Sequence, residues 1–437
     1  MTITQIAHVL QNLLGPVSNQ LALQTGFTRR SSKVTGSVFV QSLVFSSLHT
    51  PRFGYRELVT QAGIAGVTVS KQGLEQRFSA RSAALLRGVL ERAVQVVIQT
   101  QPAALPLLNR FTGVYLRDST IIGLPQALED LWPGSGSSHG RSAGLKLHTR
   151  LELLSGQLGG PVLAPARQHD RRSPFQDEQV PPGALRLADL GFFSLQQLVD
   201  DDRRGVFWLT RYKTGVLLAD EAGQPIELLT WLRQQTAVQV ERRVRIGQAQ
   251  FPCRLLVERV PPAVVEQRRR KLHEYARKKQ TPVSAELLAL AEWTLLLTNL
   301  PAEPFPIADV LVLLHVRWQI ELLFKRWKSL LAIDEWRSTD PWRILTELYA
   351  KLLAALIAHW CVLTRAWSAP RLSLWQATQL VQQFAPLLAL ALPDFTTLLS
   401  CLTFIESQIL THCRLQPRRR RPALFQLLEN PSCISLA

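Results

Sequence analysis

The sequence is poor in cysteine, in acidic residues and in long apolar runs, and each shortage excludes a class of protein. Only 5 of its 437 residues are cysteine, and they are widely separated. No zinc-type Cys/His spacing and no disulfide framework of a small secreted protein is present, so we expect reduced, mostly buried thiols. The uninterrupted apolar runs are much shorter than the roughly 20 residues that cross a bilayer. Met1–Leu14 lacks the pattern of a signal peptide.

The shortage of acidic residues leaves the chain strongly basic. Lys and Arg number 50 against 33 Asp and Glu, so the net charge is +17 and the pI about 10.3. This excess favours a polyanionic partner, because each phosphate that Lys or Arg neutralises releases condensed counterions. The hydrophobic fraction of 46% is ample for buried cores. We expect two to four domains in a cytoplasmic protein associated with the nucleoid, without a membrane partner.

The first hundred residues have helical patterning. Tyr55–Gly63 and Ser70–Ser79 are typical of two short helices joined by a turn, with Ser70 capping the second. Such a pair could present polar and basic side chains to a DNA groove, but a plain helical hairpin explains the pattern equally well. A longer amphipathic helix is expected at about 83–99.

Strand-like alternation begins near residue 110. Thr112–Arg117 predicts a strand that stops at Asp118, and Leu185–Ala188 one that stops at Asp189. Further strands are expected at 145–154, 159–166 and 205–213, with a helix at about 193–198. Three strands, a fourth, a helix and a fifth is the order of a ribonuclease-H-like α/β core.

This core pattern is interrupted between about 214 and 290. The interruption contains strand-like segments at 238–246 and 253–260 and a basic helix at about 263–279. The core resumes at Trp293–Thr298 and continues into a helix from about Val310 to Leu331. We therefore predict an α/β fold whose ribonuclease-H-like mixed-sheet core is interrupted by a β-rich insertion and flanked by helical domains. The expected boundaries are a DNA-binding N-terminal domain (1–104), the two core parts (105–213 and 291–339), the insertion (214–290) and a C-terminal domain with a role in dimerisation (340–437).

Three carboxylates are the candidates for chemistry. Asp118 and Asp189 follow apolar runs, where α/β sheets place ligands, although a single solvated Asp at a strand end is common. Glu321 follows Arg317 by four residues and precedes Lys328 by seven, which puts the three on one helical stripe. A salt-bridged helix face is the plainer interpretation of that stripe. Together with two strand-end Asp residues, it favours phosphodiester chemistry, in which carboxylates hold two metal ions and cations bind phosphates.

These motifs resemble those of DDE transposases of the insertion-sequence-four group. The motifs that carry the resemblance are Leu-Arg-Asp118-Ser-Thr, Leu-Ala-Asp189-Leu-Gly-Phe-Phe-Ser and Arg317-x3-Glu321-x6-Lys328. The last keeps the Arg-Glu-Lys spacing of the group's signature, and the resemblance extends at least from Tyr115 to Lys328. The Tyr that opens the signature is replaced here by Leu314, which puts one DNA contact in doubt but not the metal site.

The resemblance implies an enzyme with Asp118, Asp189 and Glu321 as catalytic metal ligands for two Mg²⁺ ions, which Mn²⁺ can replace. It implies double-stranded DNA as the partner, both as terminal inverted repeats and as target. Such enzymes nick DNA to expose a 3′-OH, commonly cut the second strand through a hairpin, and join the 3′-OH to target DNA. They work on paired ends, so a homodimer is expected. In the family a Trp stacks on a flipped base, a role that falls on Trp293 here, with a core role as the alternative.

Cations on several segments are candidate DNA contacts. With Trp293, the candidate DNA-binding residues are Arg317, Lys328, Arg211, Lys213, Arg268, Arg269, Arg270 and Lys271. Arg418–Arg421 is a further basic cluster, whereas Asp200-Asp201-Asp202 is more typical of a solvated loop. Two other functions stay open, a domesticated or decayed transposase that binds DNA without catalysis and a structure-specific nuclease on the same core.

Overall fold

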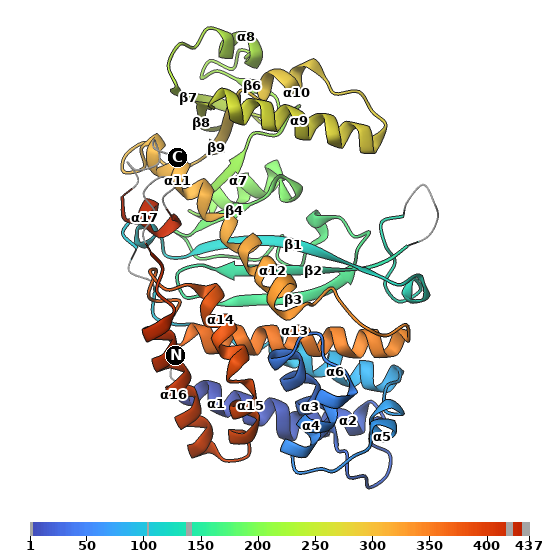
Figure 1. Ribbon diagram of the computed structural model, residues 1–437. Helices are drawn as coiled ribbons and strands as arrows, with labels where there is room; N and C mark the ends of the chain where they lie inside the picture. The colour runs from blue at the N-terminus through green and yellow to red at the C-terminus, as the bar shows by residue number, and fades with distance from the viewer. Residues whose placement is uncertain (1–2, 103–104, 137–141, 417–422, 431–437) are drawn as a thin grey trace. The chain divides into compact units, whose positions relative to one another are not determined.

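The computed structural model describes residues 3–102, 105–136, 142–416 and 423–430. The chain divides into unit 1, residues 1–106, 117–175 and 319–419, and unit 2, residues 107–116, 176–318 and 420–437. The predicted α/β class with a mixed sheet is confirmed. The described strands form a nine-stranded sheet in the order β3-β2-β1-β4-β5-β9-β8-β7-β6 (Figure 1). β1 (Val114–Leu124) belongs to both units, since its first three residues lie in unit 2.

The strands that lie wholly in unit 1 are joined by a tight turn. β2 (Ala143–Glu152) pairs antiparallel with β3 (Leu158–Pro165), and Gly156 lies in the turn between them. Gly156 has a φ of +71°, and a Cβ added there would lie 2.3 Å from Leu363 Cδ2. Only glycine fits both the backbone conformation and the close approach. The Gly156 carbonyl accepts a hydrogen bond from His359 Nε2 at 2.8 Å, which joins the turn to the C-terminal helices.

Helix α13 (Pro341–Leu363) is the core element of unit 1. Every residue from Ile344 to Leu363 is buried, and α13 contacts α3, α6, α14 and α16. Figure 1 shows it running between the strands of unit 1 and the N-terminal helices. Besides α12 (Trp318–Leu331), the unit contains α1 (Ile3–Asn12), α2 (Ser18–Gln24), α3 (Gly36–His49), α4 (Tyr55–Ile64), α5 (Lys71–Glu75), α6 (Ala80–Val94), α14 (Leu374–Gln383), α15 (Ala385–Ala391) and α16 (Phe395–His412).

Unit 2 contains the other strands of the sheet. β4 (Leu185–Ala188) is parallel to β5 (Phe207–Arg211), which pairs antiparallel with β9 (Trp293–Thr298). β9 continues antiparallel to β8 (Phe251–Arg259), β7 (Gln239–Ile246) and β6 (Leu218–Ala219). The helices of this unit are α7 (Leu195–Arg203), α8 (Leu228–Arg233), α9 (Pro262–Lys279), α10 (Ala285–Leu290), α11 (Ile307–Val316) and α17 (Leu424–Glu429). The strands of the predicted insertion therefore extend the core's own sheet.

Two expected element boundaries near the candidate site were wrong. β1 continues six residues past Asp118 to Leu124, because Thr120, Ile121 and Ile122 are β-branched and keep the strand extended. The helix expected at 310–331 is two helices, α11 and α12 (Trp318–Leu331).

The second helix of the N-terminal pair is also shorter than expected. α5 ends at Glu75 after five residues, although Ser70 caps it as predicted, since its Oγ accepts from Gly73 N–H at 3.1 Å. A helix of five residues presents little surface to a DNA groove.

The thiol prediction is confirmed for the described cysteines. Cys253, Cys361 and Cys413 are buried, Cys401 is partly buried, and all four are free; Cys433 and the Arg418–Arg421 cluster lie outside the described residues. One described helix, α13, is long and apolar enough to cross a membrane by length and composition alone. Its apolar window is entirely buried in the protein.

Candidate active site

Asp118 lies in the middle of β1 and is half-buried. The N–H of Ser119 donates to its Oδ1 at 2.7 Å. The prediction that Asp118 sits at a strand end is therefore wrong, and a carboxylate inside a strand is held more rigidly than one in a loop. Successive side chains point to opposite faces of a strand, so Ser119 projects from the face opposite to Asp118.

Sequence reasoning missed a polar network that begins at Ser119. Its Oγ donates to Asp170 Oδ1 at 2.7 Å, and the buried ammonium of Lys146 donates to the same oxygen at 3.0 Å. Burial raises the pKa of Asp170, but the hydrogen bonds from Ser119 and Lys146 and the charge of Lys146 outweigh it, so the net pKa is lowered. The network fixes the residue next to Asp118. No spacing in the sequence signals it, because the three residues come from β1, β2 and the short 3-10 helix Asp170–Arg172.

Glu321 lies on α12 in the same unit as Asp118 and is half-buried. α12 buries Ile320, Leu323, Phe324, Arg326, Trp327 and Leu331. Lys328 Nζ donates to the Ile121 carbonyl at 3.2 Å, which ties α12 to β1 three residues after Asp118. Figure 1 shows α12 crossing the strands of unit 1. The helix that carries Glu321 is therefore anchored on the strand that carries Asp118.

Asp189 and Arg317 come together in unit 2. Asp189 follows β4 directly, as predicted, and its side chain is 50% exposed. Arg317 joins α11 to α12 and keeps right-handed helical dihedral angles (φ −51°, ψ −32°), so the four-residue spacing to Glu321 remains a helical one. Arg317 Nη1 lies 4.0 Å from Asp189 Oδ1, and its side chain is only 13% exposed. Two predicted site residues thus form an ion pair.

Arg211 is the last residue of β5, and Lys213 lies just beyond the strand. Lys213 Nζ is 5.7 Å from the ring centroid of Phe193, four residues after Asp189. Arg211 is exposed, and its charge, after the larger effect of burial, lowers the pKa of Arg268. Positive charge from β5 and α9 therefore gathers in this part of unit 2.

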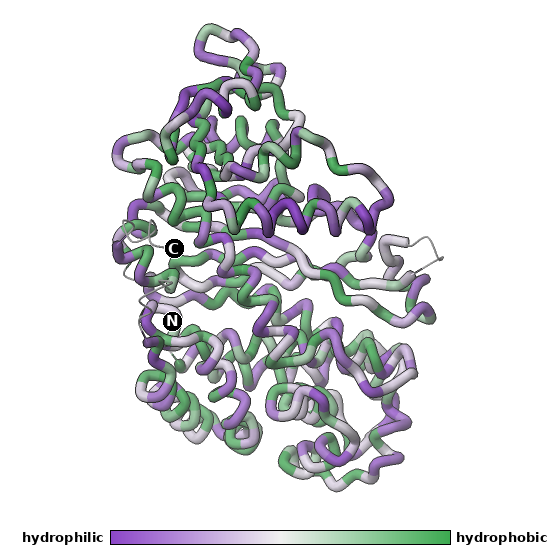
Figure 2. Tube along the Cα trace, turned by 45° about the horizontal axis from the view of Figure 1, so that its top comes forward, coloured by the Kyte–Doolittle hydropathy of each residue, from purple (hydrophilic) through white to green (hydrophobic). Residues whose placement is uncertain are grey.

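The four predicted cations of α9 have different surroundings. Arg268 donates to the Trp293 carbonyl at 2.8 Å and to Thr294 Oγ1 at 2.9 Å, and Arg269 pairs with Glu292 at 2.7 Å. Arg270 and Lys271 are exposed. α9 buries a single residue, Ala276, and most of this helix is hydrophilic in Figure 2. Arg268 thus anchors the helix on β9, Arg269 pairs with the residue before that strand, and Arg270 and Lys271 face solvent.

Trp293 is a core residue of unit 2 in this structure. It is 7% exposed and packs within the cluster that includes Leu255, Val257 and Leu295. The guanidinium of Arg259 lies 4.5 Å from its ring centroid. This is the core environment named as the alternative to base stacking. A base could stack on the indole only after Arg259 or its neighbours move.

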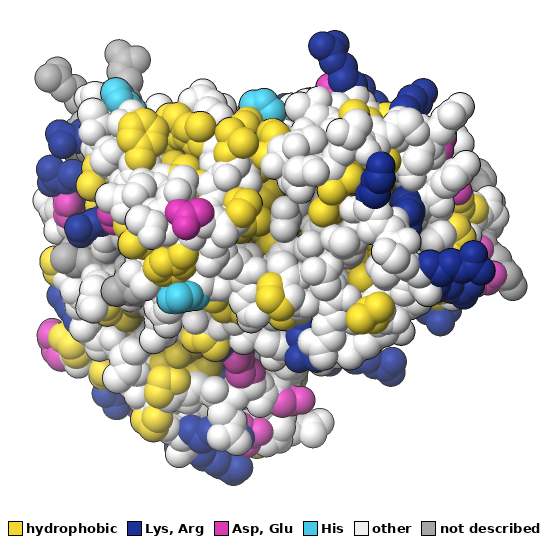
Figure 3. All heavy atoms as spheres, turned by 90° about the horizontal axis from the view of Figure 1, so that it is seen from below, with side chains coloured by type: hydrophobic (Ala, Val, Ile, Leu, Met, Phe, Trp, Pro, Cys, Tyr) yellow, Lys and Arg dark blue, Asp and Glu magenta, His cyan; other side chains and the backbone are white. Residues whose placement is uncertain are grey.

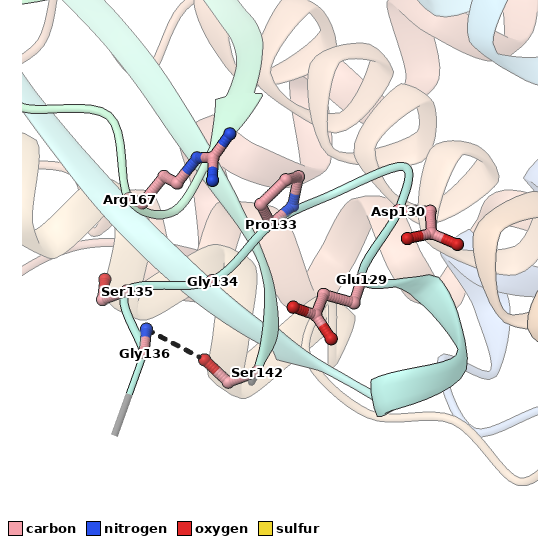
Figure 4. Close-up of a pocket in the computed structure, with 8 residues that line it drawn as sticks. All are labelled: Glu129, Asp130, Pro133, Gly134, Ser135, Gly136, Ser142 and Arg167. Atoms are coloured by element: carbon pink, nitrogen blue, oxygen red, sulfur yellow. Dashed lines mark hydrogen bonds between the residues drawn. The ribbon is translucent and has the colours of Figure 1, made fainter. Parts of the chain in front are cut away.

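The described residues contain no group of three or more His, Cys, Asp or Glu side chains arranged to hold a metal ion. Two of the three predicted ligands lie in unit 1 and the third, Asp189, in unit 2. A cavity of about 640 Å³ lies elsewhere in unit 1, and its lining includes Glu129, Asp130, Ser142 and Arg167 (Figure 4). No predicted site residue lines it.

One further interpretation was wrong. Asp201 is fully buried within α7 and pairs with Arg186 on β4 at 3.2 Å, so the Asp200–Asp202 run is not a solvated loop. Gln197 Nε2 also donates to Asp201 at 3.0 Å. The pair holds α7 against β4, the strand that precedes Asp189.

Comparison with known proteins identifies the family. The family model described as "Transposase DDE domain" matches residues 109–357, which contain every predicted metal ligand. The chain belongs to the DDE transposase family. It is 28% identical over 360 residues to the transposase of insertion sequence element IS231F from Bacillus thuringiensis subsp. israelensis, covering 77% of this chain and 75% of the relative. It is 22% identical over 376 residues to the IS1151 transposase of Clostridium perfringens, covering 79% and 78%.

A shorter match relates the transposase to the putative transposase InsL of IS186A from Escherichia coli strain K12. The two are 30% identical over 245 residues, 52% of this chain and 61% of the relative. These relatives confirm the predicted resemblance to insertion-sequence transposases of the insertion-sequence-four type and the ribonuclease-H-like α/β class. The chain is a DDE transposase, an enzyme whose family uses divalent metal ions.

Proposed function

We propose that this transposase binds the terminal inverted repeats of its own insertion sequence and moves the element by cutting and rejoining DNA. Asp118, Asp189 and Glu321 are its metal ligands. The observation that carries this proposal is the anchoring of α12 on β1 through Lys328 and Ile121, which brings the helix of Glu321 to the strand of Asp118. The family match across 109–357 supports it.

The donor set fits a hard divalent cation. Carboxylate oxygens are the ligands that Mg²⁺ prefers, and Mg²⁺ is commonly held by one or two carboxylates together with substrate phosphates. A site completed by DNA phosphates agrees with the absence of a ready cluster among the described residues. We propose two Mg²⁺ ions, replaceable by Mn²⁺. When bound, they would lower the pKa of the attacking water and stabilise the leaving oxygen.

The cations beside the carboxylates bind the DNA backbone in this proposal. Arg317 is held by Asp189 at 4.0 Å and is mostly buried, so its guanidinium is oriented before DNA arrives. A planar guanidinium suits two-point contact with a phosphate, whereas the ammonium of Lys328 acts as a point charge. Arg211, Lys213, Arg270 and Lys271 extend this basic surface over unit 2.

The proposed reaction begins with a hydrolysis and ends with a transesterification. In the first, a water oxygen attacks the phosphorus at the element's end, the P–O3′ bond breaks, and the released 3′ oxygen takes up a proton. In the second, that 3′-OH attacks a phosphodiester of target DNA, so one P–O bond forms as another breaks. No energy source is needed, because the hydrolysis is itself favourable and the transesterification exchanges one phosphodiester bond for an equivalent one.

Cleavage assays on a plasmid that carries the matching repeats test the three ligands. With Mg²⁺ we expect the wild-type protein to release the element, and Asp118→Asn, Asp189→Asn and Glu321→Gln each to lower the rate by about 10³-fold or more without loss of binding. Normal cleavage by any one variant removes that residue from the site. A wild type that binds but never cleaves favours the decayed-transposase alternative.

The second-strand cut through a hairpin is part of the proposal, with Trp293 as the stacking residue. Stacking on an aromatic side chain is worth about 1–3 kcal/mol per base, which helps to offset unstacking of the flipped base. In the same assay, Trp293→Ala should slow hairpin formation more than the first nick. Equal loss of both steps, with a lower melting temperature, assigns Trp293 to the core alone.

The cellular setting follows from the substrate. We propose that the transposase acts in the cytoplasm at the nucleoid, and as a homodimer because two DNA ends must be held together. The C-terminal helices α15 and α16 expose Leu387, Leu390, Phe404 and Leu410. Figure 3 views the molecule from below Figure 1 and shows hydrophobic side chains on this face, which is formed by helices. These features support a protein contact at the C-terminal helices.

A further inference from the structure

The C-terminal end of α12 has an uncommon conformation. α12 ends at Leu331, and Ala332 follows with a φ of +46°. This left-handed conformation is usually taken by glycine, because a Cβ makes it unfavourable by roughly 1–2 kcal/mol. The Ile333 N–H donates to the Trp327 carbonyl at 3.4 Å, so the backbone turns back on the last turn of α12. Contacts with neighbouring residues must therefore stabilise this conformation of Ala332.

A buried lysine contacts this turn. Lys351, on α13, is 2% exposed. Its Nζ donates to the Ala332 carbonyl at 3.0 Å and also to the Glu335 carbonyl. Both carbonyls lie just beyond the helix end, where unpaired carbonyl groups and the helix dipole concentrate negative charge. A cation buried there satisfies two backbone acceptors and opposes the dipole.

Two further contacts hold the same end. Gln382 Nε2, on α14, donates to the Leu330 carbonyl at 2.8 Å. Arg52 Nη2 donates to Glu335 Oε1 at 2.7 Å. Lys351, Gln382 and Arg52 come from three parts of the chain that all belong to unit 1. The end of α12 is thus held from several sides, with Lys351 the most buried member.

Keeping Lys351 charged costs free energy, because its ammonium group is removed from water. Burial is the largest influence on this residue and lowers its pKa to about 8, against the opposing effect of Glu347 and Glu335. Hydrogen bonds from an ionised donor are roughly twice as strong as neutral ones. An apolar side chain of similar volume would fill the space without this cost, so packing alone does not account for a lysine at this position.

We infer that Lys351 is a positioning residue that locks the C-terminal end of α12 and thereby fixes where Glu321 lies over β1. The inference rests on the proposed function, since Glu321 is taken as a metal ligand. Glu321 lies ten residues before Leu331, about 15 Å along a rigid helix at 1.5 Å per residue. With Lys328 bound to Ile121 between them, a shift or rotation at the locked end moves both Lys328 and Glu321. Lys351 itself does not touch the reacting atoms.

The experiment compares Lys351→Met with Tyr349→Phe in the full-length protein. Tyr349 is a neighbouring buried residue of α13, and its hydroxyl contacts Trp132 rather than α12. Without metal or DNA, we expect hydrogen exchange in the segment 327–336 to be about tenfold faster or more in Lys351→Met and unchanged in Tyr349→Phe. Unchanged exchange in Lys351→Met overturns the lock.

A second measurement tests positioning. In Lys351→Met the Mg²⁺ concentration for half-maximal cleavage should rise several-fold, while the affinity for DNA is unchanged. The control Tyr349→Phe, compared under conditions where its melting temperature is lowered as much as that of Lys351→Met, should not show this rise. Faster exchange with normal metal dependence overturns the positioning role. If Glu321→Gln cleaves normally, the proposed function fails while the exchange result still stands. If Lys351→Met does not fold, Gln382→Met takes its place, because it removes the donor to the Leu330 carbonyl. We expect a smaller increase of hydrogen exchange in the segment 327–336. Unchanged exchange in that segment overturns the lock.

Discussion

At the residue scale, two buried histidines influence how the stability of this transposase depends on pH. His148, on β2, is fully buried, and both ring nitrogens lack a hydrogen-bond partner among the described residues. Burial, with the nearby charge of Lys146, lowers its pKa to about 4. His359 is also buried, and burial lowers its pKa to about 3. Both histidines are therefore neutral in the folded protein at neutral pH.

The sign of the pH dependence follows from these values. The pKa of His148 is about 4 when folded and 6.5 when unfolded, so the unfolded chain binds the extra proton between these values. The free energy of unfolding must therefore fall as the pH is lowered from 6.5 towards 4.

We predict that His148→Leu weakens this acid sensitivity. Leucine has no polar atom to leave unpaired, so the variant should be at least as stable as wild type at pH 7. The loss of unfolding free energy between pH 7 and pH 5 should be smaller than in wild type by about 2 kcal/mol. Urea unfolding at the two pH values measures both quantities. Equal losses of unfolding free energy in the two proteins contradict the assignment of the acid sensitivity to His148. The contribution of His359 is the same in both proteins and therefore cancels from the comparison.

At the scale of elements, α9 shows how one basic run divides into two roles. Arg268 and Arg269 bind the backbone of β9 and Glu292, while Arg270 and Lys271 face solvent, as do Arg277, Lys278 and Lys279. The exposed residues at 267, 270, 271, 274 and 278 follow helical spacing and share one face of the helix. Tyr275, 63% exposed, lies beside them.

We predict that, of the cations of α9, only those that face solvent contribute to DNA binding. In Arg270→Ala/Lys271→Ala the slope of log affinity against log salt should decrease by about 0.9 for each phosphate that the protein no longer neutralises, with little change in melting temperature. Arg268→Ala should lower the melting temperature and leave the salt slope unchanged, since it leaves the Trp293 carbonyl and Thr294 without their donor. Fluorescence anisotropy at several salt concentrations and thermal unfolding separate the two. An identical salt slope in wild type and the double variant removes Arg270 and Lys271 from the DNA interface.

At the scale of the whole molecule, the proposed ligands are shared between two units. Asp118 and Glu321 belong to unit 1, and Asp189 with Arg317 to unit 2, while β1 runs through both. A reaction on two DNA ends adds a second requirement, because each end needs its own set of carboxylates.

We predict that two chains act on two ends. Each chain has a mass of 49.1 kDa, so mass photometry with DNA that carries the terminal repeat should show a complex of two chains and two DNA duplexes. Glu321→Gln should form this complex without cutting, which separates assembly from catalysis. Cleavage by complexes that contain one chain and one duplex contradicts the prediction.

Much of the fold and of the candidate site could be predicted from the sequence. β4 and β9 begin and end where expected, because short apolar runs bounded by polar residues are strongly periodic. The Arg317–Glu321–Lys328 spacing predicted one helical stripe. Local chemistry also determined the turn at Gly156 and the cap at Ser70.

Other features depended on tertiary contacts. The burial of Trp293, the pairing of Asp201 with Arg186 and the carbonyl contacts of Arg268 join residues far apart in the chain. Lys351 gives no local signal, since a lysine in an apolar helix differs from an exposed one only by what packs around it. The sequence by itself determined which residue types were available for the chemistry and the periodicity that places them on strands and helices. The tertiary structure alone decided which charges are buried and what they bind, because burial and its free-energy cost depend on neighbours that the chain brings together only on folding.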